Sequence, residues 1–156
     1  MTAPLKHTLT SSCCHCRLAG VSKKRLLTII SQFMEKAVPA LDADEVFNAL
    51  MARERLGSTG LGNGIAIPHC RLKTCSGIVG ALITLDEPID FDAADGKPVD
   101  LLFVLIVPGE HADEHVKTLA TLAEKFSDFD FCHALRQARN DDELYNMAMA
   151  EIKDVI

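Results

Sequence analysis

The sequence predicts a single domain of the α/β class. Segments whose apolar residues recur at helical spacing alternate with two short runs that are apolar on both faces, at residues 78–85 and 101–107. The 156 residues are enough for one hydrophobic core, and 48% hydrophobic with 24% charged residues is ordinary globular composition. Helices that alternate with buried strands indicate a layered α/β fold and exclude general disorder.

No periodic pattern extends through residues 1–20, so an irregular N-terminal arm is expected there, followed by the folded domain at residues 21–156. The first helix is expected to begin at Ser22 and to end before Pro39, which cannot continue it. Its apolar face carries Leu26, Ile30, Phe33 and Ala37, with Leu27, Met34 and Val38 beside it. Basic residues fill positions 23–25, where the helix dipole favours acids, which indicates a solvated face or a partner surface.

Asp42 and Glu45 have the spacing of a variant capping box, so a second helix is expected to follow Asp42 and to end at Gly57. Its apolar residues are Val46, Phe47, Leu50 and Met51. Four glycines then fall within residues 57–64, and an apolar run at residues 65–67 ends at a proline.

Three helices are expected in the C-terminal third. The first covers about residues 112–126, after the Pro108-Gly109 turn, and a shorter one covers residues 131–138. Asn140 is the expected cap of the last helix. The residues predicted to be buried on the first of these helices are Val116, Leu119, Ala120, Ala123 and Phe126.

Charge and hydropathy exclude several classes of function. The formal net charge is −6, which disfavours nucleic acid as a partner. The longest apolar run, residues 101–107, is far shorter than a membrane span, so no membrane insertion is expected. The N-terminus has no apolar core of a secretory signal, which predicts a cytoplasmic protein.

Six cysteines are expected to remain reduced in that compartment. Three of them lie in the segment Cys13-Cys14-His15-Cys16, which has half of the ligands of a structural zinc site. No second Cys/His pair with matching spacing follows, so the segment is predicted to hold free thiols in a mobile arm, without a metal.

The glycine-rich segment does not fit a nucleotide site. Gly57 to Gly62 has the opening spacing of a P-loop, but Asn63 and Gly64 stand where lysine and a hydroxyl residue are needed. What remains is a backbone whose N–H groups can approach an oxyanion. It leads directly to Pro68 and then to His69, a histidine expected at the exit of a strand.

A second histidine cluster spans residues 111–115. His111, Glu114 and His115 match the H-x-x-E-H signature of inverted zinc peptidases, which also need a distant third ligand. The alternative is that His115 lies at the edge of the buried stripe of the third helix as a neutral imidazole.

Taken together, these residues resemble the enzyme IIA component of the bacterial phosphoenolpyruvate-dependent sugar phosphotransferase system, in its mannitol/fructose class. Within that class the nitrogen-regulatory branch is the most similar. The resemblance covers about residues 20–150. It rests on Arg53-Glu-Arg-Leu-Gly-Ser58-Thr59-Gly-Leu-Gly-Asn-Gly-Ile-Ala-Ile-Pro-His69, and on Ser22-Lys-Lys-Arg-Leu, Pro98-Val-Asp-Leu-Leu-Phe, Val107-Pro-Gly and Asp142-Glu-Leu-Tyr.

The resemblance implies a mixed β-sheet flanked by helices and phosphoryl transfer through one histidine, without a cofactor. His69 matches the residue that is phosphorylated on its tele nitrogen, and His115 matches the second active-site histidine. Arg53 matches the active-site arginine, and Ser58 with Thr59 matches the hydroxyl pair expected to bind phosphate. His111 matches no functional position of the family.

The expected function is therefore that of a phosphocarrier rather than a turnover enzyme. An HPr-like protein would donate the phosphoryl group to His69, and the phosphorylation state would regulate target proteins such as sensor kinases or transporters in nitrogen or potassium metabolism. The alternatives are a sugar-transport enzyme IIA that passes phosphate to a IIB protein, a zinc metallopeptidase and a pure binding module.

Overall fold

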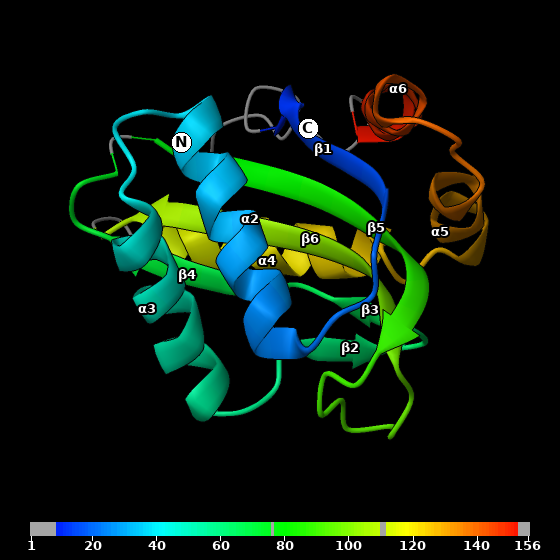
Figure 1. Cartoon of the computed structure of the whole chain (residues 1–156), viewed down its shortest axis with the longest axis horizontal. Coiled ribbons are helices and arrows are strands. Elements are labelled where there is room, and N and C mark those ends of the chain that lie inside the picture. The colour runs from blue at the N-terminus through cyan, green and yellow to red at the C-terminus, as the bar shows by residue number, and fades with distance from the viewer. Residues whose placement is uncertain (1–8, 76, 110–111, 153–156) are drawn as a thin grey trace.

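Within the described residues, six strands form one sheet and helices cover both of its faces (Figure 1). The structure, a computed structural model, describes residues 9–75, 77–109 and 112–152, and for residues 112–115 and 152 the backbone alone. The strands are β1 (Leu9–Leu18), β2 (Gly60–Gly62), β3 (Ile65–Ala66), β4 (His69–Leu72), β5 (Val79–Ile89) and β6 (Val99–Pro108). The helices are α2 (Lys23–Ala37), α3 (Ala43–Arg55), α4 (Ala112–Lys125), α5 (Phe129–Arg136) and α6 (Asp141–Ile152).

The sheet is mixed, as the family resemblance implies. Its order is β1-β5-β6-β3-β2, with β4 also paired to β6. Strand β5 runs antiparallel to β6, whereas β1 is parallel to β5, and β3 and β4 are parallel to β6. The predicted α/β class is confirmed.

Strand β6 explains why residues 101–107 are uninterruptedly apolar. Leu102, Val104 and Ile106 belong to the core beneath α2 and α3. Alternate residues, such as Leu101 and Phe103, pack with α4, α5 and α6 on the opposite face. Because a strand with helices on both faces has no solvated side, every position along it is apolar.

The first two helices begin where the sequence predicts. The Arg25 N–H donates to the Ser22 side chain at 3.2 Å, and the Asp42 carboxylate accepts from the N–H groups of Asp44 and Glu45. These caps satisfy backbone donors that have no partner inside the helix. The core residues of α2 are Leu26, Leu27, Ile30 and Met34, which confirms the predicted apolar stripe in its main part.

The predicted burial of α4 is wrong for Val116 and Ala120, both of which are exposed; the side chain of Val116 is 58% exposed. Phe126 is fully buried as predicted, and so is Leu122, one helical turn before it, which was not predicted. The apolar face of α4 that packs on the sheet is therefore rotated relative to the predicted face. Val116 lies outside this face and is exposed on the molecular surface.

The prediction of an irregular arm is wrong for residues 9–18, which form β1 at an edge of the sheet. Two register shifts interrupt the pairing of β1 with β5, and Arg17 has a positive φ of 55°. These irregularities break the two-residue alternation by which a strand is recognised in a sequence.

The thiols in β1 are likewise not in a mobile arm. Cys13 packs into the core beneath α2 and α3, and Cys14 packs into the core on the opposite face. Free cysteine behaves as a small apolar residue, so a strand between two cores can hold two in succession. The half-buried Cys16 lies beside them, and its thiol contacts the Ala138 carbonyl.

Differential alkylation tests the burial of these thiols. Burial raises the pKa of Cys13, and raises that of Cys14 to about 12, so neither forms much thiolate at pH 8. Cys16 should be alkylated well before both in the native chain, and all three at similar rates in guanidinium, as read by peptide mass spectrometry. Native-state alkylation of Cys13 and Cys14 at the rate of the unfolded chain would contradict their place in β1.

No helix in the described ranges is both long and apolar enough to cross a lipid bilayer.

Candidate functional site

His69 is the first residue of β4, rather than a residue that follows the exit of a strand. It lies in register with Leu105 of β6, and the Leu105 N–H donates to the Pro68 carbonyl at 2.9 Å. Pro68 separates β3 from β4, because proline has no N–H to offer to the ladder. The histidine is thus carried on the rigid edge of the sheet and not on a free loop.

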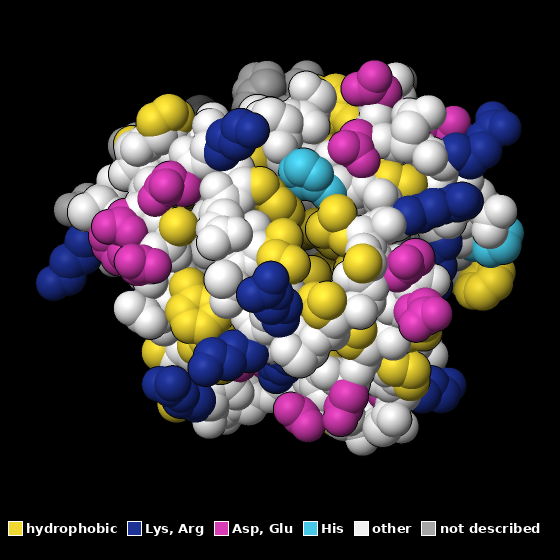
Figure 2. Space-filling view, viewed as in Figure 1, with side chains coloured by type: hydrophobic (Ala, Val, Ile, Leu, Met, Phe, Trp, Pro, Cys, Tyr) yellow, Lys and Arg dark blue, Asp and Glu magenta, His cyan; other side chains and the backbone are white. Residues whose placement is uncertain are grey.

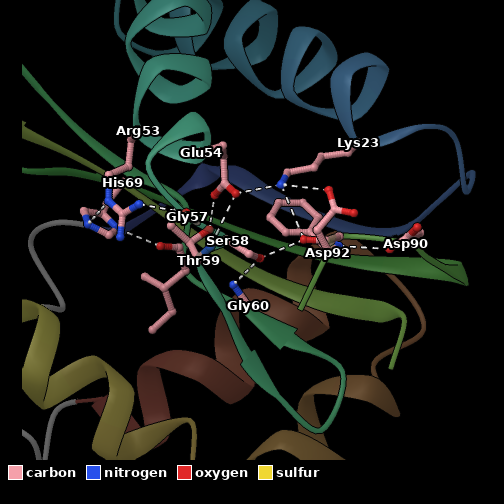
Figure 3. A network of polar contacts seen from close by, with 12 residues as sticks. Lys23, Arg53, Glu54, Gly57, Ser58, Thr59, Gly60, His69, Asp90 and Asp92 are labelled. Carbon is pink, nitrogen blue, oxygen red and sulfur yellow. Dashed lines mark hydrogen bonds and ion pairs between the residues drawn. The ribbon is translucent and has the colours of Figure 1, made fainter. Parts of the chain in front are cut away.

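The hydrogen bonds of His69 define its tautomer. Nδ1 lies 2.8 Å from the Ile67 carbonyl oxygen, which can only accept, so Nδ1 carries a proton. The Arg53 Nε–H donates to Nε2 at 3.3 Å, which requires a lone pair on Nε2 (Figure 3). The ring nitrogen of His69 that carries the lone pair is therefore Nε2, the tele position.

Arg53 reaches the histidine from the last turn of α3. Its guanidinium also donates to the Gly57 carbonyl at 2.9 Å, so one side chain links His69 to the loop that follows the helix. A cation in the last turn is favoured by the negative end of the helix dipole. The structure brings Arg53 and His69 together as the sequence predicts.

Burial lowers the pKa of His69, chiefly because the imidazolium would lose solvation. The hydrogen bond to Ile67 acts in the opposite direction, the charges of Arg53 and Arg71 lower the pKa further, and the charge of Glu54 raises it. The balance keeps the ring neutral at neutral pH, which is the form that has a lone pair to attack an electrophile.

An NMR titration tests this balance. His69 should titrate below the value of about 6.5 of a solvated imidazole, and below its own value in the urea-unfolded chain. Arg53→Gln should raise the pKa, because it removes a nearby positive charge. A pKa of His69 above that of the unfolded chain would contradict the site described here.

The imidazole lies in a cleft of about 530 Å³ between α3, β4, β6 and α4. Leu56, which is 84% exposed, and Val116 both line it, so the cleft has an exposed apolar rim. Arg71 lies two residues from His69 in β4 and also lines it. Sequence reasoning missed Arg71, because its place beside the histidine depends on a strand that was not predicted.

Ser58 and Thr59 are not among the residues that line this cleft, and their hydroxyl protons are used in other hydrogen bonds (Figure 3). Ser58 Oγ donates to the Phe91 carbonyl at 2.7 Å, and Thr59 Oγ1 donates to the carboxylate of Glu54. A hydroxyl has one proton to donate. The predicted contact of either hydroxyl with phosphate therefore requires a rotation that breaks these bonds.

The backbone of His115 belongs to α4, close in sequence to the cleft residue Val116. The side chains of His115 and Glu114, and all of His111, lie outside the described residues. Among the side chains that are described, no group of three His, Cys, Asp or Glu residues converges as a metal site. Cys13 and Cys14, from the other candidate metal segment, belong to cores on opposite faces of the sheet.

Three comparisons relate this arrangement to known proteins. Residues 8–149 match the family described as phosphoenolpyruvate-dependent sugar phosphotransferase system, EIIA 2. The nitrogen regulatory protein of Pseudomonas aeruginosa is 45% identical over 145 residues, which are 93% of this chain and 94% of that protein.

Two solved structures share the fold. The nitrogen regulatory protein IIA-Ntr of Neisseria meningitidis is 38% identical, with a TM-score of 0.82 over 93% of this chain and 99% of that one. Mannitol IIA of Escherichia coli is 19% identical, with a TM-score of 0.67 over 88% and 96% of the two chains, and it shows the fold alone.

Proposed function

The chain belongs to the EIIA 2 family of the phosphoenolpyruvate-dependent sugar phosphotransferase system, and from that premise we propose that Nε2 of His69 accepts a phosphoryl group from an HPr-like carrier. The protein is a phosphocarrier in nitrogen regulation, in accord with its 45% identity to a nitrogen regulatory protein over nearly the full length of both chains. The observation that carries the assignment to His69 is its neutral ring, whose Nε2 lone pair lies in the cleft beside Arg53.

The transfer follows from the positions of these atoms. The Nε2 lone pair of His69 attacks the phosphorus of a donor phosphohistidine, and a new P–N bond forms. The P–N bond of the donor breaks, and its electron pair returns to the donor ring. Nδ1 keeps its proton throughout, and the Ile67 carbonyl stabilises the positive charge that the phosphorylated ring acquires.

Arg53 supplies the electrostatic part of the reaction. Before the carrier binds, the guanidinium donates a hydrogen bond to the Nε2 lone pair. When the carrier is bound, the guanidinium turns to the phosphoryl oxygens, whose negative charge grows during transfer. Arg71 adds positive charge on the same strand. As part of the proposal, His115 orients a phosphoryl oxygen as the second active-site histidine, and Ser58 and Thr59 contribute to binding phosphate from the adjoining loop.

The exposed apolar rim of the cleft is suited to a protein partner, since the exposed side chains of Leu56 and Val116 line the same cleft as His69. We propose the cytoplasm as the place of transfer, where the phosphoenolpyruvate-dependent carriers act. Sensor kinases and transporters are the proposed regulated targets. Membership of this family argues against the metallopeptidase alternative. The nitrogen regulatory protein is more similar to this chain than mannitol IIA is, which favours the regulatory function over sugar transport.

Reconstitution tests the phosphocarrier proposal. The chain is incubated with phosphoenolpyruvate, enzyme I and an HPr-type carrier, and bound phosphate is followed by mass spectrometry. Phosphate should appear only when all three are present. A chain that stays unmodified with active carriers would overturn the proposal.

Calorimetry tests the regulatory output. Phosphorylation adds a charge of about −1.5 to −2 at the cleft if phosphohistidine behaves as other phosphoresidues do. A target protein that binds the unmodified chain through the cleft should bind the phosphorylated chain with a clearly different affinity, while His69→Ala should bind like the unmodified form. Equal affinities for both forms would contradict charge-gated regulation and leave a simple phosphate courier.

A further inference from the structure

The buried side chains of Glu54 and Thr59 form a polar network with the half-buried Lys23, next to the His69 site (Figure 3). The Lys23 ammonium lies 2.7 Å from the Glu54 carboxylate, and these side chains are 17% and 3% exposed. The same carboxylate accepts from the Thr59 hydroxyl and, at 3.3 Å, from the Thr59 N–H. The predictions of a solvated face or a partner surface are therefore wrong for Lys23, because its ammonium is bound within the chain by Glu54 and, at 3.8 Å, by the exposed Asp92.

Such a network is more than a surface ion pair. Burying a carboxylate is unfavourable unless charge and hydrogen bonds compensate it, and here a cation, an N–H and a hydroxyl all converge on one group. The Lys23 ammonium also lies over the Phe91 ring, with its Nζ 4.5 Å from the ring centroid. Figure 2 shows further Lys and Arg side chains on the surface where the N-terminal end of α2 meets the C-terminal end of α3.

Glu54 follows Arg53 directly in the last turn of α3, so the two side chains leave the helix in different directions. Arg53 extends to His69, whereas Glu54 extends to Lys23 at the start of α2. The loop after α3 is held from both sides, by Arg53 at Gly57 and by Glu54 at Thr59. Rotation of this helical turn would break the contacts of both residues together.

We propose that Glu54 is a positioning residue for phosphoryl transfer at His69: bound by Lys23 and Thr59, it fixes the last turn of α3 and thereby keeps the Arg53 guanidinium beside Nε2, within reach of the phosphoryl oxygens. The inference rests on the proposed role of His69. Lys23 has a part in it as well, because its ammonium compensates the charge of the buried Glu54 carboxylate.

The test compares Glu54→Gln with Glu45→Gln. Glutamine has nearly the shape of glutamate but lacks the charge and one of the two acceptors. Glu45 is the matched control, since it lies on the same helix and also accepts from a threonine, Thr74, at 3.1 Å, but on the exposed surface. Lys23→Met, with the exposed Lys24→Met as its control, is the second pair if Glu54→Gln does not fold.

Two readouts are taken on folded protein. The first is single-turnover transfer from a phosphorylated HPr-type carrier. At saturating carrier, Glu54→Gln should slow transfer by about 10- to 100-fold, the expected cost of a misplaced catalytic group. The half-saturating carrier concentration should be unchanged, because a side chain that is 3% exposed does not reach the carrier. The second is the ¹⁵N signal of His69 Nε2, which should shift as the Arg53 bond is lost, while Glu45→Gln leaves both readouts unchanged.

A wild-type transfer rate together with an unshifted Nε2 signal in Glu54→Gln would overturn the inference. So would a change in half-saturating concentration alone, which would place Glu54 in carrier binding. A wild-type chain that takes no phosphate on His69 would instead overturn the proposed function, whatever the Glu54 variants do.

Discussion

His69→Ala is expected to abolish phosphorylation of the chain while leaving its fold intact. The substitution removes the neutral Nε2 that would bond to phosphorus, and no other described side chain occupies its place beside Arg53 in the cleft. The loss to the core is small, because the imidazole is only half-buried at the edge of the sheet.

The measurement is transfer of labelled phosphate from phosphoenolpyruvate through the carriers, with acid-labile and base-stable product expected in the wild type. His133→Ala is the control, since His133 is an exposed histidine on α5 whose loss should leave labelling unchanged. Circular dichroism serves to check that both variants are folded. Labelling that persists in His69→Ala would mean that another residue receives the phosphate.

Arg53→Gln is expected to slow transfer by about 10²–10³-fold, the usual loss when one preorganised electrostatic donor is removed. Glutamine retains a polar amide, on a shorter side chain, but has neither the positive charge nor the forked donor of the guanidinium. Residual labelling should remain, because Arg53 stabilises the phosphoryl group through charge and hydrogen bonds and forms no covalent bond to it.

Arg55→Gln provides the comparison, as an exposed arginine two residues away on the same helix. Rates are measured in a single turnover at saturating carrier, so that binding does not limit them. Equal rates for the two variants would show that the contact between Arg53 and His69 has no part in transfer.

The elements that the sequence predicted well are those with strong local signals. Ser22 and Asp42 cap α2 and α3 through their own side chains, and this chemistry is visible in a few neighbouring residues. Strand β6 was recognisable because burial on both faces makes each of its positions apolar. The pairing of His69 with Arg53 followed from the family resemblance and not from spacing alone.

The features that were missed depend on contacts between distant residues. Strand β1 is irregular in its own pattern and is defined by its pairing with β5. Strand β4 is four residues long and directly follows a proline. It is defined by its parallel pairing with β6, which lies far away in the sequence. Lys23 looked misplaced in the first turn of α2 because its partner, Glu54, lies 31 positions along the chain. No local pattern contains such information.

The most direct test of the central claim is NMR of the phosphorylated, ¹⁵N-labelled chain, which identifies the nitrogen bonded to phosphorus. The geometry predicts a phosphorus coupling on Nε2 of His69, with Nδ1 still protonated and bonded to the Ile67 carbonyl. Phosphorus bonded to Nδ1 of His69, or to any other residue, would contradict the account.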